Sequence, residues 1–284
     1  MAKAAIELGV TQSAISQVIA RLEADLGVQL FDRSQRGVTP TVYGEALIRR
    51  GRAALDEVRT GLQEIAFLKS EGMGLIRIGC PETLAASVLP LAIETFTKRF
   101  PAVTIEVETF TGAEAADKLS DRSIDLVLAR DGPGLAVLSA SSDFQVTRLF
   151  EDKLRIVVGA HSRWAMLAEP RLNDLADAPW IILPYGWGEG VLPDAFAAEG
   201  LPAPHAVLKT FSIHLRLHLV ATGQYVTALP HSVFRLHGER FDLKELPIEL
   251  PALPYGVALV TLKNRTLTRS VDQFIQSTNE IFKG

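Results

Sequence analysis

The chain has 284 residues, of which 48% are hydrophobic, and a formal net charge of −4. This length allows two or more domains with sizeable packed cores. No apolar run approaches the roughly 18 residues that a membrane-spanning helix needs. The first residues lack the apolar centre of a signal peptide, because Glu7 and Gly9 interrupt it. The single cysteine, Cys80, excludes an internal disulfide and suits a reducing compartment. We therefore predict a soluble, cytoplasmic protein.

The charges are unevenly distributed along the chain. Residues 1–52 contain 7 Lys and Arg against 5 Asp and Glu, whereas the remaining residues contain 22 against 28. Residues 1–52 are thus mildly basic and the rest of the chain is acidic, which indicates that any contact with phosphates lies near the amino terminus.

The first two predicted helices form a helix-turn-helix. A short helix over Ala2–Leu8 is followed by Gly9, which suits a left-handed C-cap. Thr11 is placed to cap a second helix over Gln12–Leu26, and Val10 and Ile15 have the spacing of a hydrophobic staple. Two helices joined by a turn that contains glycine are typical of this motif.

The second helix is amphipathic. Its apolar face contains Ile15, Val18, Ile19, Leu22 and Leu26, and its other faces contain Gln12, Ser13, Ser16, Gln17 and Arg21. Short hydroxyl and amide side chains suit a surface that approaches the edges of bases. Taken alone, the helix fits an ordinary surface helix equally well.

A longer pattern decides between these interpretations. It comprises residues 4–16, Leu22-Glu23, Leu26-Gly27, residues 30–33, Val38-Thr39, Thr41 and Gly44-Glu45. The pattern resembles the N-terminal signature of LysR-type transcriptional regulators, which bind double-stranded DNA. The resemblance implies that the second helix enters the major groove and that residues 33–39 form a wing beside the phosphates. The DNA-binding residues that we predict are Thr11, Gln12, Ser13, Ser16, Gln17, Arg21, Arg33 and Arg36.

One feature departs from the family pattern. Members of the family have a further helix before the helix-turn-helix, and it covers the apolar face formed here by Leu8, Ile15, Leu22 and Phe31. We expect these side chains to be partly uncovered. Either the start of the protein lies upstream or the DNA-binding domain of this form is damaged; we favour an upstream start.

A long helix is predicted next, over residues 42–70, with Thr41 as its N-cap. Apolar or small residues recur in steps of three and four, the spacing of a two-stranded coiled coil, at Ile48, Gly51, Leu55, Val58, Leu62 and Ile65. The alternative is a helix that lies on its own domain. Its length and its place between two unlike regions favour dimerisation, and the family implies a dimer of dimers.

The remaining chain alternates strands and helices, which predicts parallel α/β units. We expect strands at 75–80, Val103–Thr109, 124–129, 154–160, 180–183, 206–211, 225–228 and Tyr255–Leu262, and helices at 82–99, 113–121, 189–199, 212–222 and 267–282. The predicted fold class is thus α/β: a truncated, all-α winged helix-turn-helix (1–41), a linker helix (42–70) and a two-lobed effector domain (71–284). Lobe I comprises 75–152 and 254–284, and lobe II comprises 153–253.

The body also resembles the LysR effector domain, which is similar to periplasmic solute-binding proteins. The matching residues are Leu89-Pro90, Phe96, Phe100-Pro101, residues 124–127, residues 221–223 and Leu229-Pro230. This resemblance implies a small-molecule effector between the lobes and no cofactor. Residues 180–201 are similar to a subgroup whose effectors include sugars and aromatic acids.

Ligands of open α/β lobes bind beyond the carboxyl ends of the strands. By family position, Thr83 matches a hydroxyl residue that holds the effector, and Thr111 lies in a loop that supplies another. Arg130 is expected either to pair with an anionic effector or to pair with Asp131, and Tyr185 and Trp187 are expected either to stack on a ring or to fill the gap between the lobes. The predicted effector-binding residues are Pro81, Glu82, Thr83, Thr111, Gly112, Arg130, Tyr185, Gly186, Trp187, Phe211 and Thr227.

Other chemistry is weakly supported. His214 and His218 have a spacing that suits a metal ion. No third ligand is evident nearby, since His205 is expected in a strand. We therefore favour the interpretation that both are ordinary surface histidines. Cys80 has no resolving partner and is expected to be a buried apolar residue. Enzyme motifs for nucleotides or acyl transfer are absent from the sequence. We predict a regulator rather than an enzyme, the alternative being a cytoplasmic small-molecule-binding protein that does not act on DNA.

Overall fold

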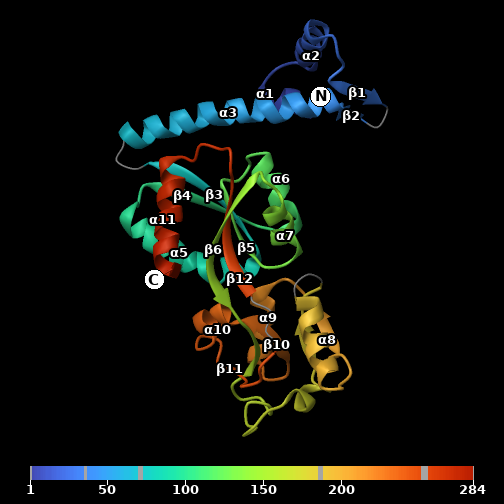
Figure 1. Cartoon of the computed structure of the whole chain (residues 1–284), viewed down its shortest axis with the longest axis vertical. Coiled ribbons are helices and arrows are strands. Elements are labelled where there is room, and N and C mark those ends of the chain that lie inside the picture. The colour runs from blue at the N-terminus through green and yellow to red at the C-terminus, as the bar shows by residue number, and fades with distance from the viewer. Residues whose placement is uncertain (1, 35–36, 70–72, 185–187, 251–254, 284) are drawn as a thin grey trace. The chain divides into compact units, whose positions relative to one another are not determined.

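The structure, a computed structural model, describes residues 2–34, 37–69, 73–184, 188–250 and 255–283. The chain forms two compact units, residues 1–59 and 60–284, which we describe separately (Figure 1). Within the described residues, none of the helices combines the length and the apolar character that crossing a bilayer requires.

The first unit begins with the two predicted helices, α1 (Ala2–Leu8) and α2 (Gln12–Leu26). Gly9 adopts a left-handed φ of 64°, which glycine tolerates best. The Thr11 hydroxyl accepts a hydrogen bond of 3.2 Å from the backbone N–H of Ala14, so the predicted N-cap is confirmed. Helix α2 has no buried residue, and Val18, Leu22 and Leu26 are exposed. Of the four side chains expected to be partly uncovered, Leu8 and Leu22 are exposed and Ile15 and Phe31 are half-buried, so the expectation is confirmed.

A β-hairpin follows α2 at the position of the predicted wing. Its strands, β1 (Phe31–Ser34) and β2 (Gly37–Pro40), pair antiparallel from Phe31 opposite Pro40 to Ser34 opposite Gly37. The Glu23 carboxylate of α2 accepts hydrogen bonds from the N–H groups of Leu30, at 2.8 Å, and Phe31, at 3.1 Å. Glu23 thus fixes the start of the hairpin relative to α2.

The long helix α3 (Val42–Lys69) begins directly after its predicted cap. The Thr41 hydroxyl accepts from the N–H of Gly44 at 3.1 Å and donates to the carbonyl of Gln29 at 2.7 Å. Gly44 lies against the backbone of Leu30, where an added Cβ would overlap with the Leu30 carbonyl oxygen. The first turn of α3 can therefore approach the hairpin only because residue 44 is glycine.

Lobe I is built on a five-stranded sheet with the order β4-β3-β5-β12-β6. Its strands are β3 (Gly74–Cys80), β4 (Val103–Thr109), β5 (Leu126–Arg130), β6 (Phe144–Asp152) and β12 (Tyr255–Leu262). Strand β3 is parallel to β4 and β5, whereas β12 is antiparallel to β5 and β6. The predicted parallel unit of β3, β4 and β5 is confirmed, and β12, which returns from lobe II, adds an antiparallel pairing that makes the sheet mixed.

Helices cover both faces of this sheet (Figure 1). They are α4 (Glu82–Ala85), α5 (Val88–Arg99), the 3₁₀ turn η1 (Gly112–Glu114), α6 (Ala115–Ser120), α7 (Pro133–Ala140) and α11 (Arg269–Lys283). Phe96 of α5 packs edge-on against Phe274 of α11, with ring centroids 5.2 Å apart. The single helix predicted over 82–99 is wrong: Ser87 leaves the helical region, with φ −132° and ψ −64°, and divides it in two.

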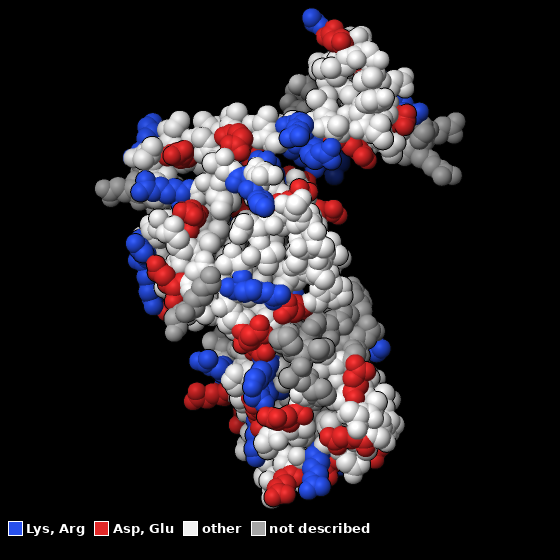
Figure 2. Space-filling view, viewed as in Figure 1, with Lys and Arg blue, Asp and Glu red and all other residues white. Residues whose placement is uncertain are grey.

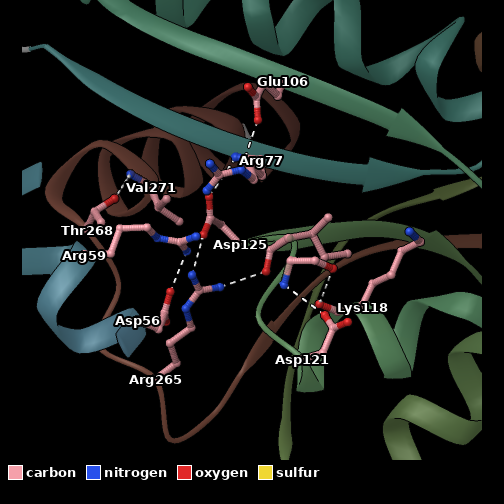
Figure 3. Close-up of polar contacts among 12 residues, drawn as sticks. Asp56, Arg59, Arg77, Glu106, Lys118, Asp121, Asp125, Arg265, Thr268 and Val271 are labelled. Atoms are coloured by element: carbon pink, nitrogen blue, oxygen red, sulfur yellow. Dashed lines mark hydrogen bonds and ion pairs between the residues drawn. The ribbon is translucent and has the colours of Figure 1, made fainter. Parts of the chain in front are cut away.

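A buried ion pair joins two loops of lobe I (Figure 3). Arg265 donates to the Asp125 carboxylate at 2.6 Å and to the Ile124 carbonyl at 2.8 Å. The other Asp125 oxygen accepts from the N–H of Arg77 at 2.7 Å. The loop after β12 is thereby tied to the start of β5 and to β3.

Lobe II has a second five-stranded sheet, with the order β11-β7-β10-β8-β9. Its strands are β7 (Leu154–Gly159), β8 (Trp180–Ile182), β9 (Ala206–Lys209), β10 (Val226–Pro230) and β11 (Leu243–Glu245). Strand β8 is parallel to β9 and β10, and β7 is antiparallel to β10 and β11. The sheet is again mixed rather than wholly parallel. His205, expected in a strand, lies just before β9.

The helices of lobe II are η2 (Leu172–Leu175), α8 (Gly188–Ala198), α9 (Ile213–Ala221) and α10 (His231–His237). Trp180 is fully buried, packs against Phe196, and donates its indole N–H to the Leu175 carbonyl at 3.0 Å. The predicted α/β class is confirmed, with sheets of mixed direction.

Candidate effector-binding site and DNA-reading surface

The polar face of α2 is open to solvent. Thr11, Gln12, Ser13, Gln17 and Arg21 are exposed, and Ser16 is half-buried. Arg33 is exposed on β1, and Arg36 lies outside the described residues. The structure thus presents short polar side chains from one helix beside a two-stranded hairpin. Glu23, which orients the hairpin, was part of the sequence pattern, but its hydrogen bonds could not be foreseen from spacing.

Three neighbouring parallel strands bring the predicted residues of lobe I to one edge of the sheet. Pro81, Glu82 and Thr83 follow β3, Thr111 follows β4, and Arg130 ends β5. Since β3 lies between β4 and β5, these strand ends are adjacent. The Thr83 hydroxyl accepts from Arg130 Nε at 3.4 Å, which places two of the predicted residues in contact.

Arg130 is buried, and its guanidinium group is held within the protein. It pairs with Asp152 at 2.9 Å and donates to the Ser232 hydroxyl at 3.2 Å. The Ser232 hydroxyl donates to the same carboxylate at 2.6 Å. Burial opposes ionisation of Asp152, but the Arg130 charge and the hydrogen bonds from Ser232, Arg130 and Lys153 outweigh it and lower the pKa of this carboxyl.

The alternative that Arg130 pairs with Asp131 is wrong. Asp131 forms an ion pair with Arg148 and accepts from the N–H of Gly256 at 2.8 Å. The actual partner, Asp152, ends β6, a strand that is not evident in the sequence because its residues include no continuous apolar run. Neither Asp152 nor Ser232 carried a sequence signal.

Two hydrogen bonds join the segment after β3 to lobe II. The Glu82 carboxylate accepts from the N–H of Ile213, the first residue of α9, at 3.0 Å. The ring of His237, on α10, donates from Nε2 to the Ala86 carbonyl at 2.7 Å. Together with the contact between Arg130 and Ser232, these bonds bring the predicted edge of lobe I against the starts of α9 and α10.

Thr111 and Gly112 border the same edge. Thr111 is half-buried and lies 3.4 Å from a Glu114 carboxylate oxygen, to which its hydroxyl donates. Gly112 packs against Gly134 of α7, where an added Cβ would lie 3.2 Å from the Gly134 Cα. The hydroxyl of Thr111 is thus oriented by the Glu114 carboxylate and makes no capping hydrogen bond to the backbone of η1.

Thr227 does not fit its predicted role. Its side chain is fully buried, and its hydroxyl donates to the Ile181 carbonyl at 2.7 Å and accepts from the buried Arg216 at 2.8 Å. All of these partners belong to lobe II, so Thr227 holds α9 against the sheet instead of facing a ligand.

The remaining predictions on lobe II are partly described. Phe211 is half-buried just before α9, and Ser212 caps this helix through the N–H of Leu215, at 3.3 Å. Tyr185, Gly186 and Trp187 lie outside the described residues. A pocket of about 360 Å³ lies elsewhere in lobe II, is lined by residues including Val207, Leu219 and Tyr225, and contains none of the predicted residues.

Cys80 is fully buried at the end of β3, and burial raises the pKa of its thiol to about 12. A thiolate is therefore disfavoured, in line with the expected role as an apolar core residue. Figure 2 shows Lys and Arg interspersed with Asp and Glu over the face of the two lobes that it presents.

Two family profiles match the chain. The LysR substrate binding domain matches residues 69–283, and the bacterial regulatory helix-turn-helix protein of the lysR family matches residues 1–45.

Curated relatives span nearly the whole chain. The transcriptional dual regulator GltC of Bacillus subtilis is 29% identical over 95% of this chain and 88% of its own length. The regulator GbpR of Azospirillum brasilense is 28% identical over 94% of this chain and 77% of its own length.

Solved structures share the fold. Full-length OxyR of Pseudomonas aeruginosa covers 97% of this chain and 88% of its own, with 22% identity and a TM-score of 0.66. Full-length CbnR complexed with its target DNA covers 100% of this chain and 94% of its own, with 19% identity and a TM-score of 0.61.

Proposed function

This chain belongs to the LysR family of transcriptional regulators, and we propose that a small molecule bound between its two lobes controls how it engages promoter DNA. The predicted family and regulatory function are confirmed by the two family profiles and by the curated relatives. These relatives are transcriptional regulators and not enzymes. The residues, the ligand and the assembly are our proposals. We place the protein in the cytoplasm, where its DNA is.

Direct reading of bases is assigned to the polar face of α2. Gln12, Ser13, Ser16 and Gln17 contact base edges, since amides pair with adenine and hydroxyls with several edges. Thr11 and Arg21 flank them, and Arg33 and Arg36 contact phosphates from the hairpin. All described members of this set are exposed except Ser16, which is half-buried, and this accessibility supports the assignment.

Dimerisation is assigned to α3. Its described seam exposes Leu55, Val58, Leu62 and Ile65, each more than half accessible. Large apolar side chains in a repeating stripe are stabilised when a second helix covers them. We call the helix-turn-helix and its hairpin, residues 2–40, the reading head. Two chains paired in this way would present two reading heads to two half-sites in the DNA, and two such dimers would form the tetramer that we expect.

The observation that carries the effector site is the convergence of Thr83, Thr111 and Arg130 at adjacent strand ends, opposite the start of α9. Ligands of open α/β sheets bind in this position. We assign effector contacts to Pro81, Glu82, Thr83, Thr111, Gly112 and Phe211, and to Tyr185, Gly186 and Trp187 because they follow a strand of lobe II in the sequence. Arg130 acts mainly by orienting Thr83.

The charges of this region favour a sugar over an aromatic acid. The Arg130 charge is balanced by Asp152, and Glu82 places a carboxylate at the start of α9, where an anionic ligand would otherwise be stabilised. Tyr185, Gly186 and Trp187 add no charge at neutral pH. A neutral, hydroxylated ligand avoids repulsion by Glu82 and can bond with Thr83 and Thr111.

A ligand screen by thermal shift tests the site. The panel pairs each neutral sugar with its sugar acid, and we expect a sugar to raise the Tm. The shift should be lost in Thr83→Val and kept in Thr97→Val, the same change on α5. A shift that persists undiminished in Thr83→Val would overturn the site, whereas preferred binding of the acid would overturn only the assignment of ligand charge.

A further inference from the structure

The histidines of this protein are confined to one part of the chain. All six lie between residues 161 and 237, within lobe II. Two of them, His214 and His218, are exposed and lie one turn apart on α9, with their Nε2 atoms 3.0 Å apart. This pair is not used by the DNA-reading surface or by the proposed effector site.

A neighbouring aromatic ring orients both imidazoles. Phe241 packs edge-on against each of them, with an interplanar angle of 88° and centroid distances of 6.2 Å to His214 and 5.0 Å to His218. The two imidazoles meet at 76°, with centroids 4.4 Å apart. Rings that are held in place by packing lose little freedom when they bind a common partner.

The spacing of the two nitrogen atoms fits one metal ion. A transition-metal ion binds imidazole nitrogen at about 2.0–2.1 Å, so two nitrogens at a right angle around it are about 2.9 Å apart. The observed 3.0 Å is close to this value. Right angles between nitrogen ligands are typical of the tetragonal geometry of Cu²⁺ and Ni²⁺.

We propose that His214 and His218 chelate a Cu²⁺ or Ni²⁺ ion through their Nε2 atoms. Without the metal, one Nε2 donates its proton to the other in a hydrogen bond. On binding, that proton moves to Nδ1 of the same ring, so both Nε2 lone pairs coordinate the ion.

The remaining coordination positions are filled by water. Within the described part of the chain, no group of three or more His, Cys, Asp or Glu residues is placed to hold a metal. The described residues therefore supply two ligands, and the site stays open to exchange, unlike a closed structural site. Cys80, fully buried in lobe I, does not compete for the ion.

Metal binding at this place stabilises the beginning of α9. His214 follows Ile213, whose N–H bonds to Glu82 of lobe I. An ion that bridges residues 214 and 218 crosslinks one turn of this helix, and because it binds the folded chain it raises the Tm.

Isothermal titration of the untagged full-length chain with CuCl₂ or NiCl₂ tests the proposal. We expect one ion per chain and a loss of affinity of at least about tenfold in His214→Ala or His218→Ala, since even outer-shell changes typically cost 10–100-fold. His161→Ala is the matched control, because His161 is exposed and pairs at 3.0 Å with the Asp242 carboxylate instead of with a second imidazole. Electron paramagnetic resonance of the Cu²⁺ complex should show two imidazole nitrogens, and one in each single variant.

Three outcomes would overturn the site: no binding above the buffer control, binding that is retained in the double variant His214→Ala/His218→Ala, or binding that is lost in His161→Ala. Both chelating histidines are exposed, so the variants are expected to fold, and far-ultraviolet circular dichroism checks this.

Discussion

The carboxylate of Glu82 in lobe I accepts a hydrogen bond of 3.0 Å from the backbone N–H of Ile213 at the start of α9 in lobe II. The first N–H groups of a helix have no partner within the helix and favour a negative charge. One side chain thus caps a helix of the opposite lobe. A change in the angle between the lobes would have to break or lengthen this bond.

Glu82→Ala should free the Ile213 amide. Removing the acceptor from a helix start costs about 0.5–2 kcal/mol of local stability, so hydrogen exchange in peptides covering residues 210–218 should accelerate. Glu82→Gln keeps an acceptor oxygen and should show a smaller effect. Unchanged exchange in both variants, with β12 peptides as the internal reference, would contradict the link between the lobes.

Asp152→Asn should destabilise the protein strongly. The change leaves the buried Arg130 charge without its partner, and breaking a buried pair in this way costs about 3–5 kcal/mol of unfolding free energy. Urea denaturation measures the loss, and Asp143→Asn, at an exposed carboxylate, is the control. Equal stability of the two variants would contradict the role of Asp152.

The loss of stability in Asp152→Asn should depend on pH in a defined way. The pKa of Asp152 is lowered on folding, so its contribution is fully present above the unfolded pKa of about 3.9 and is lost as pH falls through the folded value. The stability difference between wild type and Asp152→Asn should therefore be constant at neutral pH and shrink only in acid. A difference that shrinks between pH 8 and 6 would contradict this assignment.

Cys80 should be inert in the folded protein. Its thiol is fully buried and has a pKa of about 12, so almost no thiolate is present at pH 8. Ellman's reagent should react with it only after unfolding in urea. A rapid reaction of one thiol per native chain would show that Cys80 is accessible, as a redox sensor requires.

Gly44→Ala should destabilise the reading head. The new methyl group would overlap with the Leu30 carbonyl, and overpacking of this kind typically costs about 1–3 kcal/mol. Gly61→Ala, in the same helix, has open space around the added methyl group and should instead be neutral or stabilising by up to about 1 kcal/mol. Thermal unfolding compares the two; a stabilised Gly44→Ala would contradict the close packing.

Local signals predicted the reading head well. The bounds of α1 and α2, the Thr11 cap and the start of α3 after Thr41 follow from capping chemistry and periodicity over neighbouring residues. Strands β4 and β12 were also placed at their observed ends, because each forms a run bounded by polar or turn residues.

The site depended on contacts that no local pattern encodes. Arg130 was singled out correctly as a residue at a strand end, but its partner Asp152 lies 22 residues further on, in a strand without a continuous apolar run. Thr227 was predicted to face a ligand, although Arg216, on the neighbouring helix, engages its hydroxyl inside the lobe. In both cases the environment of the side chain is set by a partner that is distant in the sequence or on another element, which local patterns do not reveal.

Sequence-selective DNA binding tests the central claim most directly. Full-length protein is incubated with fragmented genomic DNA, bound fragments are sequenced, and affinities for the recovered site are measured over a range of salt concentrations. The account predicts that Ser16→Ala/Gln17→Ala loses preference for that site and keeps non-specific, salt-sensitive binding, while Arg33→Ala weakens binding to all fragments. Unchanged affinity and selectivity in the double variant would contradict the assignment of α2 as the helix that reads the bases.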